Sequence, residues 1–108
     1  MEFNTYQNSA LSTAVYPEDM RVIYPALGLV GEAGEVANKI KKIYRDDGGV
    51  ITPERRVQVS KELGGNLWYI AVLAADLGLS LDEIAQQNLV ELAGRQERGV
   101  IHGDGDNR

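Results

Sequence analysis

The sequence predicts an all-α protein of four helices, for three reasons. Apolar residues recur three or four positions apart over two long stretches, which places them on one helix face. Proline, glycine and capping residues divide the chain into four helical segments. Strand signals are nearly absent, because the β-branched run at residues 50–52 is very short. A small helical bundle follows from these observations.

Prolines bound the first two helices. The first is expected over residues 3–16 and ends before Pro17, because the residue before a proline disfavours helical geometry. The second is expected over residues 25–45, with Pro25 in the first turn, where proline is favoured. The sequence DDGG at residues 46–49 then stops it.

Capping residues open the third and fourth helices. Thr52 followed by Pro53 begins the third helix, and Gly78 ends it. Ser80 and Glu83 have capping-box spacing and begin the fourth, which is expected to end near residue 98.

One helical domain is therefore expected over residues 1–98, followed by an irregular tail over residues 99–108. The net charge of −5 argues against binding a nucleic-acid polymer, since no basic excess exists to displace counterions. The chain has no cysteine, no signal-peptide pattern and no apolar run of the ~20 residues that span a bilayer. We expect a cytoplasmic protein without membrane contact.

Two apolar stripes predict that the second and third helices pack antiparallel, since a short connection joins them. The stripes consist of Leu29, Ala33, Val36, Ile40 and Ile43 on the second helix, and Val59, Leu63, Leu67, Ile70, Ala74 and Leu77 on the third. We expect both stripes to form the core.

Acidic residues lie beside both stripes. Glu32 and Glu35 share a face of the second helix, which Lys39 and Lys42 continue, and Glu62 lies on the third helix. Antiparallel pairing would gather the three carboxylates, and Mg²⁺ takes oxygen ligands of this kind. A solvated face with ordinary ion pairs is the alternative, and spacing alone leaves both open.

Two segments, GEAGEVA at residues 31–37 and KELGGNLWY at residues 61–69, resemble the MazG family of nucleoside triphosphate pyrophosphohydrolases. The likeness extends over nearly the whole chain, including residues 6–7, 13–17, 77–81 and the stretch from 98 to 108. It implies an all-α MazG-like four-helix bundle assembled as a homodimer or a dimer of dimers. It also implies cleavage of nucleoside triphosphates, deoxynucleotides above all, to monophosphate and pyrophosphate with Mg²⁺, or with Mn²⁺ in its place.

The resemblance also implies a metal site, because the family pattern is Glu-x-x-Glu followed by Glu-x-x-Asp. Glu32, Glu35 and Glu62 match three positions as metal ligands and catalytic residues. Gly65 stands where the aspartate is expected, and Asn66 offers a neutral oxygen as a partial substitute. We expect weaker metal binding and turnover than in a Gly65→Asp variant.

Basic and aromatic residues are the expected substrate contacts. Lys39, Lys42, Arg95 and Arg98 are candidates for binding phosphates, although exposed charge is the alternative for each. Tyr69 is a candidate for the base pocket, since nucleobases stack on aromatic rings.

Two other functions stay open. A catalytically weakened nucleotide-binding or oligomeric protein of the same fold would follow from the loss of the ligand at Gly65. A helical module that binds a protein partner would use the acidic face only for solubility.

Overall fold

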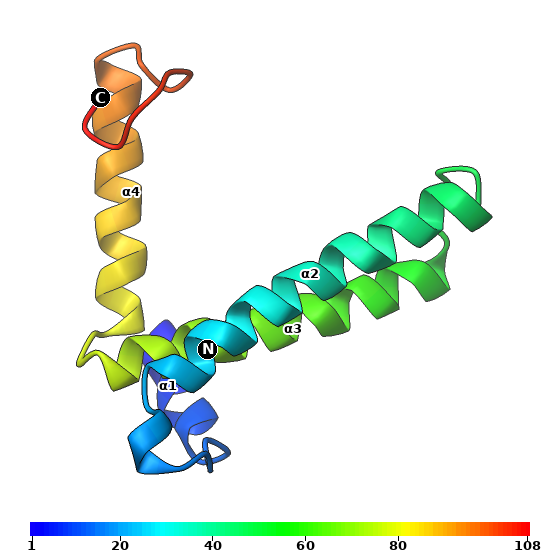
Figure 1. Cartoon of the computed structure of the whole chain (residues 1–108). Coiled ribbons are helices and arrows are strands. Elements are labelled where there is room, and N and C mark those ends of the chain that lie inside the picture. The colour runs from blue at the N-terminus through cyan, green and yellow to red at the C-terminus, as the bar shows by residue number, and fades with distance from the viewer.

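The computed structural model describes residues 1–108 and is entirely helical (Figure 1). The helices are α1 (Phe3–Leu11), α2 (Ile23–Asp46), α3 (Pro53–Asp76) and α4 (Leu81–Glu97), with a 3₁₀ helix, η1 (Glu18–Met20), between α1 and α2. The predicted all-α class with four helices is confirmed, and no strand forms. None of the helices combines the length and the apolar character needed to cross a bilayer.

Helices α2 and α3 form a long antiparallel pair, and α4 leaves the end of α3 as a separate arm (Figure 1). Helix α1 packs on α3 and on the start of α4. The radius of gyration is 16.8 Å, whereas a compact domain of this length has about 13 Å. The predicted α2–α3 pairing is therefore confirmed, but one chain alone does not close its four helices into a bundle.

The first helix is shorter than predicted and ends at Leu11. The hydroxyls of Ser12 and Thr13 donate to the backbone carbonyls of Ser9 and Ala10, at 2.6 and 2.9 Å. Side chains that bond nearby backbone in this way compete with the continuing helix, which explains the early end.

The second helix begins at Ile23, earlier than the predicted Pro25, and a strained residue precedes it. Val22 has φ +69° and ψ −54°, and the N–H of Ile23 donates to the carbonyl of Arg21 at 2.8 Å across it. This is a γ-turn of the rare positive-φ kind, and a β-branched residue seldom adopts it. Such strain costs about 1–3 kcal/mol and persists only where neighbours hold it.

Asp76, the last residue of α3, stabilises this turn through hydrogen bonds. Its carboxylate, 7% exposed, accepts hydrogen bonds from the Tyr16 hydroxyl at 2.7 Å and the Val22 N–H at 2.9 Å, and a longer one from Arg21 at 3.4 Å. Burial by itself would raise the pKa of Asp76, but the hydrogen bonds from Tyr16, Val22 and Arg21 together hold it below its usual value. Burial and the bond to Asp76 raise the pKa of Tyr16 to about 12.

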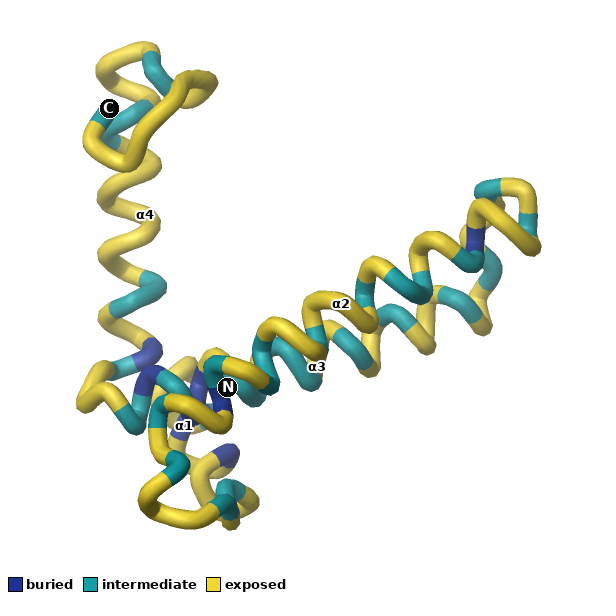
Figure 2. The backbone as a smooth tube through the Cα atoms, in the orientation of Figure 1, coloured by how far each residue is buried: buried dark blue, intermediate teal, exposed yellow.

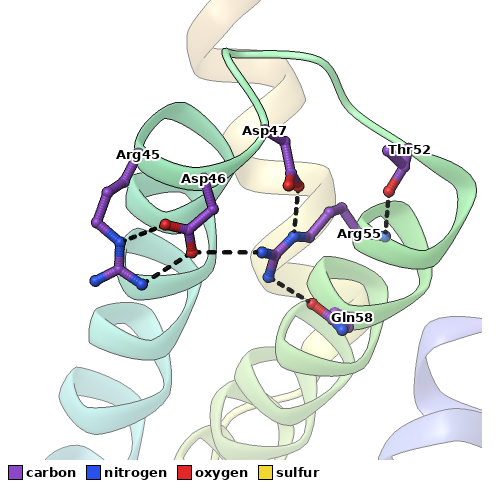
Figure 3. Close-up of polar contacts among 6 residues, drawn as sticks. All are labelled: Arg45, Asp46, Asp47, Thr52, Arg55 and Gln58. Atoms are coloured by element: carbon purple, nitrogen blue, oxygen red, sulfur yellow. Dashed lines mark hydrogen bonds and ion pairs between the residues drawn. The ribbon is translucent and has the colours of Figure 1, made fainter.

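The turn between α2 and α3 is tied by charged groups (Figure 3). Nε of Arg55 donates to Asp47 at 2.8 Å, and the same guanidinium lies 3.8 Å from the Asp46 carboxylate. The Thr52 hydroxyl accepts from the N–H of Arg55 at 3.2 Å, so the predicted N-cap is confirmed. These contacts hold the ends of the two long helices together.

The corner between α3 and α4 follows the predicted signals. Gly78 has φ +72°, and the Ser80 hydroxyl accepts from the N–H of Glu83 at 3.3 Å as the cap of α4. Gln7 of α1 fastens the corner, because its amide donates to the carbonyl of Leu79 at 3.0 Å and accepts from the N–H of Leu81 at 3.1 Å.

Burial is concentrated at this corner, and the rest of the chain is open (Figure 2). Only eight of 108 residues are buried. The main cluster comprises Ala10, Ala71, Val72 and Leu81, with Tyr6, Ala14, Tyr16 and Trp68 packed against it. Of the two predicted stripes only Ile43 and Ala74 are buried, and Leu63 is 55% exposed. The prediction that the stripes form the core of this chain is therefore wrong for most of their length, because no third helix covers them.

We expect Asp76→Asn to destabilise the fold by about 1–3 kcal/mol, because buried donors lose a charged acceptor. A lowered pKa in the folded state means that this stabilisation is complete above the ordinary aspartate value of about 4 and is lost as the pH falls through the lower folded value. Urea unfolding of both proteins at neutral and acidic pH measures the difference, which should shrink in acid. An equal difference at both pH values would contradict the role of the Asp76 charge.

Candidate metal centre

Two glycines set how α2 and α3 face each other. A Cβ on Gly28 of α2 would overlap the ring of Tyr69 on α3. A Cβ on Gly65 of α3 would lie 2.7 Å from Oε2 of Glu32 on α2. Each helix thus places one side chain in the space beside a glycine of the other helix.

This packing brings Glu32 and Glu62 together. Interaction with the Glu62 carboxyl is the main cause that raises the pKa of Glu32, and burial and the negative charge of Glu35 raise it further. A proton or a cation between two neighbouring carboxyl groups relieves the repulsion of their like charges. Carboxylate oxygens are ligands that hard divalent cations take, so Glu32 and Glu62 would supply part of the coordination shell of such a cation.

The other expected ligands are less well placed. Glu35 is exposed and affects Glu32 only through its charge, and nowhere do three His, Cys, Asp or Glu side chains gather closely enough to hold a metal ion. The amide nitrogen of Asn66 donates to the backbone carbonyl of Glu62 at 2.8 Å, within its own helix. The structure thus brings together two of the three expected carboxylates.

A row of aromatic rings runs from this pair towards the start of α2. Burial raises the pKa of Tyr69, with further contributions from Tyr24 and from the charge of Glu32. The ring centroid of Tyr69 lies 6.4 Å from that of Tyr24, which stacks on Tyr16 at 4.9 Å. On the other side Trp68 meets Tyr69 edge-on at 5.0 Å. The sequence pattern singled out Tyr69 but missed Tyr16 and Tyr24, because only the fold of the α1–α2 connection brings them near.

The expected phosphate contacts fall into two groups. Lys39 and Lys42 lie half-buried on α2, beyond Glu35. Arg95 and Arg98 lie at the far end of the α4 arm, where Arg95 donates to the Asp106 carbonyl at 3.1 Å and Arg98 to the Arg108 carbonyl at 3.0 Å. The structure does not bring the two arginines to the Glu32–Glu62 pair of the same chain.

The tail, residues 99–108, contains no helix or strand and is folded back on α4 (Figure 1). Arg108 donates to the backbone carbonyls of Val100 at 2.9 Å, Ile101 at 3.1 Å and Gly105. Arginine–carbonyl hydrogen bonds thus connect the tail to the end of α4 and to itself.

The sequence profile of the MazG nucleotide pyrophosphohydrolase domain matches residues 25–100, so the chain belongs to the MazG family. The Gene 37 protein of Mycobacterium phage L5 is 50% identical over 114 residues, which cover the whole of both chains. No solved structure matches.

The close contact at Gly28 gives a stability prediction. Gly28→Ala should destabilise the protein by about 1–3 kcal/mol, because the new methyl group overlaps the Tyr69 ring and forces the helices apart. Gly31→Ala is the matched control, since a Cβ there meets no atom within 4 Å. The control should instead gain up to about 1 kcal/mol of helix propensity. Thermal unfolding measures both, and similar stabilisation by the two variants would contradict the close contact.

Proposed function

We propose that this chain is a Mg²⁺-dependent enzyme that hydrolyses nucleoside triphosphates, with deoxynucleotides as the first candidates, to the monophosphate and pyrophosphate. The observation that carries the proposal is the Glu32–Glu62 pair on facing helices of a MazG chain. Glu32 and Glu62 would hold the cation, with Glu35 one turn farther along α2. Mn²⁺ is an alternative to Mg²⁺, because both accept carboxylate oxygens.

The cation, when bound, would neutralise the phosphates and lower the pKa of a bound water. The side chains of this site then have separate tasks. A Glu32 or Glu62 oxygen left free by the metal can accept the proton of the attacking water. Lys39 and Lys42 continue the α2 face and would bind phosphate oxygens, and the Tyr69 ring would form a wall beside the nucleoside.

Pyrophosphate release from a panel of ribo- and deoxynucleoside triphosphates tests the activity. We expect release that needs Mg²⁺ or Mn²⁺ and falls at least about a hundredfold in Glu62→Gln, since an uncharged amide holds the cation poorly. Glu54→Gln is the control, because Glu54 is an exposed residue in the first turn of the same helix. No release from any nucleotide, together with metal-dependent nucleotide binding, would favour the alternative of a nucleotide-binding protein that has lost turnover with the aspartate ligand.

We also propose that the chain works as a homodimer or a dimer of dimers. Apolar side chains left open along α2 and α3 support this, as does a groove of about 280 Å³ near the α2–α3 turn. The groove is lined by Ile40, Ile43, Ile51, Arg56, Val59, Ser60 and Leu63. Leu89 and Val90 on the α4 arm are more than 60% exposed, which fits a helix that packs on a second copy.

The position of the α4 arm decides which metal centre Arg98 can reach. Arg98 lies roughly 25 Å along α4 from the α3–α4 corner, and Glu62 lies roughly 20 Å along α3 from the same corner. An arginine side chain cannot bridge two such arms. If Arg98 binds phosphates at a metal centre, that centre belongs to another copy.

A mixing experiment tests this arrangement. Arg98→Ala and Glu62→Gln should each be nearly inactive, but their co-expressed mixture should recover about a quarter of the normal activity. That share follows because random pairing makes half of the dimers mixed, and each mixed dimer has one intact site. A mixture as inactive as its components, or a monomeric mass by light scattering, would contradict the shared site.

A further inference from the structure

Gly28 and Gly65 differ from the other glycines of the α2–α3 pair, and only at Gly65 is the neighbouring group a carboxyl group. At Gly31, Gly34 and Gly64 an added Cβ would meet no atom within 4 Å, so these glycines leave open space. At Gly65 the space is filled by a charged side chain from the opposite helix. Glycine weakens a helix interior, so a glycine that receives a neighbouring group has a physical reason to be there.

The group that fills this space is the end of Glu32. An added Cβ at Gly65 would lie 2.7 Å from Oε2, 3.0 Å from Cδ and 3.4 Å from Cγ of Glu32. The end of the side chain therefore lies across the backbone of α3 at Gly65. Glu62 lies three residues earlier on α3, so it shares the helix face on which the Glu32 carboxyl group lies.

We propose that Gly65 is a positioning residue for the metal centre, because its missing side chain lets the Glu32 carboxylate lie beside Glu62 in the place of the aspartate that the family has at position 65. This inference rests on the proposed metal-dependent function. The glycine at position 65 then reflects a different set of ligands. In this set a glutamate from α2 occupies the place of the aspartate expected on α3.

Gly65→Ala tests the proposal, with Gly64→Ala as the matched control on the same helix. Mn²⁺ binding, followed by electron paramagnetic resonance and calorimetry, is the readout, and thermal unfolding is measured alongside. We expect about tenfold or weaker Mn²⁺ affinity in Gly65→Ala, the cost usual for misplacing a ligand. The control should bind Mn²⁺ like the unmodified chain. Gly65→Asp should bind at least as tightly as the unmodified chain, because it brings its own carboxylate.

A double-mutant cycle with Glu32→Ala shows whether Gly65 acts through Glu32. Once the Glu32 side chain is removed, a methyl group at position 65 has free space, so Gly65→Ala should cause no further loss of Mn²⁺ affinity. If Gly65→Ala alone folds poorly, Glu32→Ala should restore its thermal stability to that of Gly64→Ala. Equal Mn²⁺ affinity in Gly65→Ala and Gly64→Ala, additive losses in the cycle, or no Mn²⁺ binding by the unmodified chain would each overturn the proposal.

Failure of this inference is distinct from failure of the proposed function. A chain that hydrolyses nucleotides but tolerates Gly65→Ala keeps its function and refutes the positioning role. A chain whose Mn²⁺ affinity depends on Gly65 but which releases no pyrophosphate keeps the positioning role and refutes the enzyme.

Discussion

The close approach of α2 and α3 is the constraint on which the candidate site depends. Tyr69 enters the space at Gly28, and Glu32 enters the space at Gly65. The two contacts are four residues apart on each helix, so one antiparallel register satisfies both. A shift of the helices by one residue would rotate these side chains away from the glycines. The register therefore places the Glu32 carboxylate next to Glu62.

The two ends of the α2–α3 pair are held by charged groups together with the few apolar side chains that are buried. Asp76 stabilises the strained Val22 at the start of α2, and Arg55 ties the turn at the other end. Few apolar side chains are buried between these two points, because α1 packs on α3 only near the α3–α4 corner and no helix covers the rest of the α2–α3 pair. In the proposed dimer a second copy would supply this cover, and α4, on which Leu89 and Val90 are exposed, is the element available to do so.

Much of the fold could be predicted from local signals. Thr52, Gly78 and Ser80 act through neighbouring backbone, so their sequence context was enough to place the ends of helices. The γ-turn at Val22 could not be predicted, because its stability comes from Asp76, far away in the sequence. The candidate site was predictable only in part, for a similar reason. Helical spacing put Glu32, Glu35 and Glu62 near one another, but side-chain packing decides that Glu62 affects the pKa of Glu32 more than Glu35 does. The sequence pattern identified Gly65 as the position of a lost ligand, whereas the space that Glu32 fills there depends on the opposite helix.

All of the proposed chemistry requires that Glu32 and Glu62 hold a divalent cation between α2 and α3. Anomalous diffraction from crystals soaked in Mn²⁺ is the decisive measurement, because the signal locates the metal without reference to activity. We expect a peak within about 2.0–2.5 Å of a carboxylate oxygen from each of the two glutamates. A metal bound only at other residues, with Glu32 and Glu62 still paired through a proton, would contradict this site.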